Sequence, residues 1–213
     1  MAETSYQRVA KQLRTDIIEG RLRNGEWVRM SAIAERLDVS VQPVREALQQ
    51  LEGEGLIEMI PNHGARVRGV DAQRLVHFHE IGEALESYFA RQFAEEASMK
   101  SIRELEALQS AHDAALAALD WPLVDTANVA FHRHINFGGG NQEGVDIIQR
   151  HNHLGQTLLT KAGRTTEYAE RVGREHHQLI DAIKTRDGEA AARIAAAHVR
   201  GTMTNVLAAL NEN

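Results

Sequence analysis

The segment from Asp38 to Leu56 constrains the fold of this chain more than any other part. It opens with turn-forming residues that end at Ser40, a favoured N-cap type, and Pro43 follows in the first helical turn, where a missing N–H costs nothing. Apolar residues then recur at helical spacing, and Gly55 supplies a stop signal. The pattern predicts a sharp turn and an amphipathic helix whose buried face is formed by Val44, Ala47, Leu48 and Leu51.

The flanking residues predict the rest of a small DNA-binding domain. Ser31 is expected to cap a short helix, and the turn residues 61–64 are expected to close a β-hairpin. The expected elements are helices at 5–19 and after Ser31, a short strand at 27–30, and hairpin strands at 55–60 and 65–70. Helix, helix, turn, helix and hairpin make a winged helix-turn-helix, whose third helix enters the major groove of DNA.

After Val70 the strand signals stop, and apolar residues recur at three-to-four spacing. The expected helices cover residues 72–97, 101–119, 122–136, 142–160, 165–185 and 188–210. The fold class is therefore mainly α, with a winged helix-turn-helix at 1–70 and an all-α six-helix bundle at 71–213. The joint near 70–72 is short, so movement in the bundle is expected to reach the DNA-binding part.

Charge and histidine are distributed unevenly between these two parts. The formal net charge is -6, but residues 1–70 hold ten Lys+Arg and ten Asp+Glu, so the whole excess lies in the remaining 14 bases and 20 acids. Only His63 of the 11 histidines precedes residue 70, which suggests a site in the acidic part. With no Cys, no signal peptide and no membrane-length apolar run, we expect a cytoplasmic protein with no membrane partner.

The recognition segment resembles the winged-helix domain of the GntR family of bacterial transcription regulators. The resemblance rests on Ser40 to Leu48, Leu51, Glu54-Gly55-Leu56 and Asn62-x-Gly64, and the later run resembles the FCD ligand-binding domain of the FadR-like branch. Val41 stands where the family usually has Arg, the residue best suited to grip guanine. The resemblance implies DNA contacts from Ser40, Val41, Gln42, Pro43, Arg45, His63, Gly64 and Arg66.

A candidate metal site follows from three later segments. Asn128 and His132 are four residues apart and share one helix face, while His176 and His198 fall on two later helices that can converge in a bundle. Imidazoles suit divalent ions such as Zn or Ni. The order resembles the FCD metal site, but Asn128 replaces the family's Asp, so we expect weaker metal affinity. The alternative is that each histidine simply satisfies a hydrogen bond in or near the core.

The remaining histidines and the first bundle helix carry weaker signals. His134, His151, His153 and His177 are expected to be solvated or to bridge helices, and His77 or His79 is a candidate pocket-lining residue. Many FCD relatives have Arg four residues before a glutamate on this helix, whereas this chain has Gly82 before Glu86. A carboxylate clamp is thereby missing.

These features favour a ligand-responsive transcription regulator over two other classes. A homodimer that binds a palindromic operator, and not an enzyme, is expected. The resemblance implies that it is a repressor and that it responds to a small organic acid resting on the metal. A metal-dependent hydrolase is the first alternative, but its only neighbouring base, Glu175, adjoins His176 along a helix and is expected to point elsewhere. An architectural DNA binder without an effector is the second.

Overall fold

The computed structural model describes the chain except for residues 1–3, 62, 69–71, 150–164 and 212–213. Its residues form two compact units, 1–74 and 75–213, and each unit is described by itself. None of the helices in the described part is long and apolar enough to cross a membrane.

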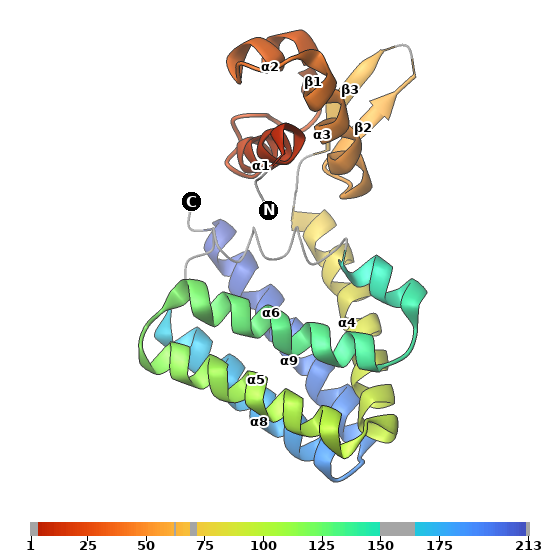
Figure 1. Ribbon diagram of the computed structural model, residues 1–213, viewed down its shortest axis with the longest axis vertical. Helices are drawn as coiled ribbons and strands as arrows, with labels where there is room; N and C mark the ends of the chain where they lie inside the picture. The colour runs from red at the N-terminus through yellow and green to blue at the C-terminus, as the bar shows by residue number, and fades with distance from the viewer. Residues whose placement is uncertain (1–3, 62, 69–71, 150–164, 212–213) are drawn as a thin grey trace. The chain divides into compact units, whose positions relative to one another are not determined.

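The N-terminal unit combines three helices with a small antiparallel sheet (Figure 1). The helices are α1 (Ser5–Ile18), α2 (Met30–Arg36) and α3 (Val41–Gly53), and the strands are β1 (Trp27–Val28), β2 (Ile57–Ile60) and β3 (Gly64–Val67), in the order β1-β3-β2. The face of α3 predicted to be buried lies in the core with apolar residues of α1. The winged helix-turn-helix prediction is confirmed.

One capping prediction is wrong, and the other is confirmed in its position. Ser31 is not an N-cap, because α2 begins at Met30, with Arg29 as the extended N-cap residue directly after β1. Ser40 does occupy the N-cap of α3, but its side chain makes no capping hydrogen bond. The hairpin strands are also shorter than expected, because Gly55, with a φ of 71°, belongs to the turn after α3.

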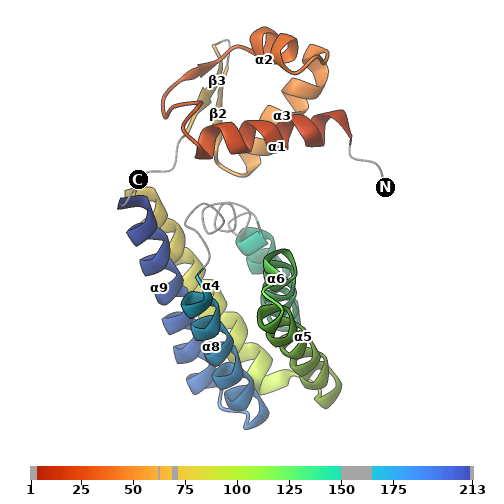
Figure 2. The same ribbon diagram turned by 90° about the vertical axis from the view of Figure 1, so that its left-hand side faces the viewer.

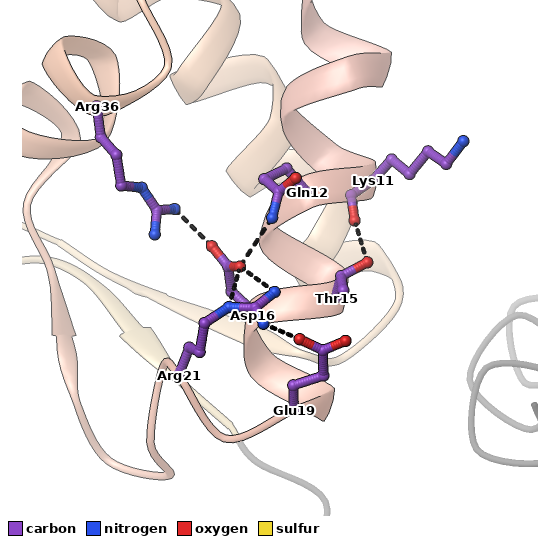
Figure 3. Close-up of polar contacts among 7 residues, drawn as sticks. All are labelled: Lys11, Gln12, Thr15, Asp16, Glu19, Arg21 and Arg36. Carbon is purple, nitrogen blue, oxygen red and sulfur yellow. Dashed lines mark hydrogen bonds and ion pairs between the residues drawn. The ribbon is translucent and has the colours of Figure 1, made fainter. Parts of the chain in front are cut away.

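A buried carboxylate holds α1 against its neighbours in this unit (Figure 3). Asp16, only 1% exposed, accepts hydrogen bonds from Arg36 at 2.5 Å, Arg21 at 2.8 Å and Gln12 at 2.9 Å. Burial alone would raise the pKa of Asp16, but these hydrogen bonds and the charge of Arg36 outweigh it and lower that pKa. The cluster therefore ties α1 to the turn after it and to α2.

The C-terminal unit is entirely helical in its described part. It contains α4 (Ala72–Glu96), α5 (Met99–Ala117), α6 (Trp121–Gly138), α8 (Thr166–Lys184), α9 (Gly188–Asn211) and helical residues 142–149. In Figure 2, α5 and α6 form one layer and α4, α8 and α9 form another. Phe89, Phe93 and Phe131 are fully buried between them. The all-α prediction is confirmed, although the helix expected at 142–160 is described only to residue 149.

Candidate metal site and DNA-binding surface

Three histidines from three helices meet inside the C-terminal unit. His132 lies on α6, His176 on α8 and His198 on α9, and one possible ligand nitrogen from each lies within 4.8 Å of the others. The Phe131 ring stacks on His176 with centroids 4.0 Å apart, which restricts the orientation of that imidazole. The sequence spacing therefore singled out the three histidines that lie side by side in the structure.

Each histidine has its Nδ1 atom next to a different side chain. His176 Nδ1 donates to Gln109 Oε1 at 2.8 Å, and His198 Nδ1 donates to Glu175 Oε2 at 2.7 Å. His132 Nδ1 lies 3.4 Å from Glu86 Oε2. These contacts favour the Nδ1–H tautomer and leave each Nε2 lone pair for an ion, the arrangement in which outer partners orient metal-binding imidazoles.

The spacing of the histidine nitrogens and the buried amide of Asn128 are compatible with a metal ion. The Nε2 atoms of His132 and His176 are 3.3 Å apart, close to the edge of about 3.3–3.4 Å that tetrahedral zinc–nitrogen bonds produce. Asn128 Oδ1, one turn before His132 on α6, is buried and has no hydrogen-bond partner within the described part of the chain. A buried carbonyl oxygen without a partner is costly, and coordination would satisfy it. Three imidazoles can therefore hold a divalent ion, and the unpartnered oxygen of Asn128, one turn before His132, is the candidate for a fourth ligand.

The electrostatics keep His132 and His176 in the form that binds metals. Burial, together with neighbouring histidines, lowers the pKa of His132 to about 3 and the pKa of His176 well below its usual value. Burial alone would raise the pKa of Glu175, but the hydrogen bond and charge of His198, with those of Arg171, lower it. Neutral imidazoles at His132 and His176 are the protonation state that a metal ion requires.

A small cavity of about 10 Å³, enough for about one water molecule, adjoins the histidines. Its polar lining consists of Glu86, His132, Asn136 and His198, and the remaining described lining residues are apolar. Neither His77 nor His79 is among them. Burial raises the pKa of Glu86. Gly82, one turn before Glu86 on α4, is buried, and among the described residues a Cβ there would have Val199 as its neighbour, at 4.0 Å.

Several residues of this site were missed or misplaced by the sequence reasoning. The expectation that Glu175 points away is wrong, because its side chain reaches across to His198 on the next helix. Gln109 on α5 and the buried Asn136 gave no sequence signal. Among the other histidines, His134 contacts Ser101 on α5, as a helix-bridging residue would, and the exposed His177 pairs with Asp113 at 2.9 Å. His151 and His153 lie outside the described residues.

The structure exposes most of the residues expected to contact DNA. Ser40, Val41, Gln42 and Arg45 are exposed at the start of α3, whereas Pro43 is half-buried there. Gln42 Nε2 donates to Glu46 at 2.8 Å, so it must exchange this partner in order to contact a base.

The wing places its own candidates in the hairpin. His63 is exposed, Gly64 has a φ of 98°, which favours glycine, and Arg66 pairs with Glu58 at 2.7 Å. Solvent screens this exposed ion pair, so Arg66 can be released from Glu58 at small cost. Trp27 on β1, not singled out from the sequence, is 49% exposed and has its ring 6.4 Å from that of His63.

Two family models match separate parts of the chain. The model for bacterial regulatory proteins of the gntR family matches residues 5–67, and the FCD domain model matches residues 77–201. A Paenarthrobacter nicotinovorans protein named "Probable D-xylose utilization operon transcriptional repressor" is 30% identical over 90% of this chain and 85% of its own. The Escherichia coli transcriptional repressor GlaR is 29% identical over 88% of this chain and 89% of its own.

Solved structures share the fold at lower identity. The structure of E. coli McbR/YncC covers 100% of this chain and 99% of its own, with a TM-score of 0.69 and 22% identity. The structure of Lar, which "controls the expression of the Listeria monocytogenes agr system", covers 98% of this chain and 99% of its own, with a TM-score of 0.75 and 18% identity. The chain therefore belongs to the GntR family of bacterial transcription regulators and carries an FCD domain.

Proposed function

We propose that this protein is a cytoplasmic transcription repressor whose operator affinity is set by a small organic acid bound at a metal ion. Residues 1–70 bind DNA, and residues 71–213 bind the effector and dimerise. Asn128, His132, His176 and His198 hold the ion, with Zn or Ni favoured by the imidazoles. The observation that carries this proposal is the convergence of three histidines, two buried and one half-buried, next to a cavity in an FCD domain.

The DNA contacts are proposed to come from the exposed start of α3 and from the wing. Ser40 and Pro43 set the helix entry, Val41 packs on a thymine methyl, and Gln42 and Arg45 read base edges or phosphate. His63, Gly64 and Arg66 contact the flanking backbone or the minor groove. Because Val41 replaces a guanine-reading Arg, the operator is expected to depart from those of Arg-bearing relatives.

A homodimer on a palindromic operator is supported by an apolar stripe on α4. Ile81 and Tyr88, two turns apart, are 44% and 41% exposed on one side of that helix. Such a stripe suits contact with a second copy, and two heads related by a two-fold axis match a palindromic site. The relative named for D-xylose utilization supports sugar metabolism as the regulated process.

The mechanism is thermodynamic linkage between two sites. An effector that binds one arrangement of the C-terminal unit better shifts the population toward it, and DNA affinity changes by the same coupling free energy, typically about 1–3 kcal/mol. The metal ion would supply the charge that holds the effector carboxylate. No feature favours the hydrolase alternative, since the carboxylate of Glu175 is engaged by His198 and Arg171.

Arg45→Ala tests the DNA-binding half of the proposal. If Arg45 reads a base, the variant should bind the selected operator more weakly by about 1–3 kcal/mol. If Arg45 contacts a phosphate, the affinity for every DNA sequence should fall by the same amount. Fluorescence anisotropy with operator and scrambled duplexes at fixed salt separates the two cases. Gln49→Ala, also exposed on α3, is the matched control. If the operator affinity of Arg45→Ala were unchanged, Arg45 would not be a DNA-contacting residue.

The effector half is tested with the metal in place and removed. Elemental analysis of the purified protein should find a transition metal, and chelation should abolish any change of operator affinity caused by added organic acids. An effect of these acids that survives chelation would contradict the metal-bound effector.

A further inference from the structure

Strand β1 carries a tryptophan whose side chain lies on the outward face of the small sheet. Trp27 is 49% exposed, whereas the next residue, Val28, is 6% exposed. Successive side chains of a strand point to opposite faces of its sheet. Val28 therefore faces the core together with its fully buried partner Ala65, and Trp27 faces solvent.

The register of the sheet places Trp27 beside the wing. Its partner on β3 is Arg66, so the two side chains project from the same face, with Cα atoms about 5 Å apart. The Trp27 ring also lies 6.4 Å from the ring of His63 in the hairpin turn. Gly25 N donates to Val67 O at 2.9 Å, which holds the segment before β1 on β3. Trp27 is therefore fixed next to the wing residues proposed to reach the flanking DNA backbone.

Arg29 adds a cation directly after β1. It follows Val28 in extended backbone, with a φ of -90° and a ψ of 109°, so its side chain projects to the same side as that of Trp27. Arg29 is exposed, and its guanidinium pairs with no residue in the part of the chain that the structure describes. Arg66, by contrast, is paired with Glu58. Arg29 can therefore bind a phosphate without first breaking an ion pair.

An aromatic ring between two arginines suits the sugar–phosphate backbone of DNA. The guanidinium groups of Arg29 and Arg66 can donate charge-assisted hydrogen bonds to phosphate oxygens. The indole of Trp27 offers an apolar face to a deoxyribose and one N–H donor. These residues adjoin the wing of a domain that belongs to a DNA-binding family, and this continuity favours DNA over a protein partner.

We propose that Trp27 and Arg29, here called the β1 strip, are a further DNA contact of the N-terminal unit. Trp27 packs on a deoxyribose beside the wing, and Arg29 binds a neighbouring phosphate. This inference rests on the DNA-binding half of the proposed function and adds two residues to its interface. Backbone contacts position a protein on DNA and carry no sequence information, so the β1 strip contributes affinity that Val41 cannot supply by gripping guanine.

Fluorescence of the full-length Trp121→Phe variant tests the contact directly, because Trp27 is then the only tryptophan. Saturating operator should shift the emission of Trp27 to shorter wavelength. It should also reduce acrylamide quenching by about twofold, since DNA would cover much of a ring that is 49% exposed. Trp121 in the Trp27→Phe variant is the control and should not respond. If saturating operator left the emission and quenching of Trp27 unchanged, the proposal would be overturned.

Two substitutions measure the contribution of the β1 strip to affinity. Trp27→Ala should weaken binding to operator and scrambled duplexes by about tenfold each, without changing the salt dependence, because the indole carries no charge. Arg29→Ala should weaken both and lower the slope of log affinity against log salt by about one.

Matched controls come from the C-terminal unit. Leu123→Ala truncates an apolar side chain that is 50% exposed, and Arg103→Ala removes an exposed arginine. Both should keep DNA affinity within about twofold of the unsubstituted protein, as is usual for surface substitutions away from an interface. An unchanged midpoint in thermal unfolding, followed by circular dichroism, verifies that each variant is folded.

The outcomes separate this inference from the proposed function. If Trp27→Ala weakened binding to the operator alone, Trp27 would read a base and the backbone contact would be wrong. If Trp27→Ala bound DNA normally but dimerised more weakly in sedimentation, the β1 strip would contact a second copy instead. If Arg45→Ala weakened operator binding and neither strip variant did, only this inference would fall. If all three variants bound DNA like the unsubstituted protein, the proposed DNA-binding surface would fall as well.

Discussion

The two units each bury a polar cluster, and the clusters differ in what completes them. In the N-terminal unit, the carboxylate of Asp16 has all its partners within the chain, in Gln12, Arg21 and Arg36. In the C-terminal unit, the Nε2 atoms of His132 and His176 face each other, and Asn128 Oδ1 has no partner among the described residues. A satisfied cluster of this kind stabilises a fold, whereas an incomplete buried cluster indicates a ligand.

The largest expected effect is on the incomplete cluster. His176→Ala removes the most buried nitrogen ligand, so zinc affinity should fall by more than about 100-fold, beyond the loss typical of an outer partner. Isothermal titration with zinc measures this change. The stability of the N-terminal unit should stay the same in this variant. If the zinc affinity of His176→Ala were within about threefold of that of the unsubstituted protein, the histidines would be structural and not metal ligands.

Asp16→Asn is the complementary change in the satisfied cluster. It leaves two arginines facing a neutral amide, and because both are about half exposed we expect a loss near the low end of the range for broken buried pairs, about 2–3 kcal/mol. In a Trp121→Phe background, the fluorescence of Trp27 reports unfolding of this unit.

Glu19→Ala is the matched control for Asp16→Asn, because Glu19 also pairs with Arg21 but is 44% exposed. Its expected loss is at most about 1 kcal/mol. Zinc affinity should be unchanged in both variants. Equal destabilisation by the two substitutions would remove the distinction between buried and exposed partners.

Lowering the pH should weaken the two units in different windows. The lowered pKa values of His132 and His176 mean that the unfolded state binds more protons than the folded state below about 6.5, so metal-free stability falls as pH drops from 7 to 5. The raised pKa of Glu86 works in the opposite direction and offsets part of this loss. The lowered pKa of Asp16 preserves its contribution until the pH falls below about 3.8.

Thermal unfolding of the metal-free protein at pH 7 and at pH 5 tests this difference. Trp121 fluorescence in a Trp27→Phe background should show a loss of about 1–2 kcal/mol for the C-terminal unit, while the N-terminal unit changes less. Added zinc should raise the stability at pH 7 more than at pH 5, since protons compete for the ligands. A pH-independent midpoint for the C-terminal unit would contradict the neutral, buried state of its histidines.

The sequence predicted what repeats along a helix and missed what crosses between helices. The periodicity of α3 and the spacing of Asn128 and His132 were readable, because each depends on one element. Ser31 was wrongly expected to cap α2, because the position of β1 in the sheet sets where that helix begins. Gln109 and Glu175 act across helix pairs, so no local pattern marks them.

Gln109 gives the smallest and sharpest test, because it lies outside the ligand set. Its Nε2 donates to Asp113 at 2.7 Å, which fixes the amide so that Oε1 accepts from His176 Nδ1. Gln109→Met keeps the size and removes the acceptor, and loss of such an outer partner should lower zinc affinity by about tenfold. Gln109→Glu restores the acceptor and should recover most of that affinity.

The readout for Gln109 is a zinc titration combined with ¹⁵N NMR of the imidazoles. The Nδ1–H tautomer of His176 should dominate in the unsubstituted protein and in Gln109→Glu, and it should lose population in Gln109→Met. His177→Ala is the control, because His177 contacts Asp113 from the exposed side and should leave zinc affinity within about twofold. If Gln109→Met bound zinc as tightly as the unsubstituted protein, the tautomer of His176 would be set by the ion itself, and the C-terminal cluster would need no support from α5.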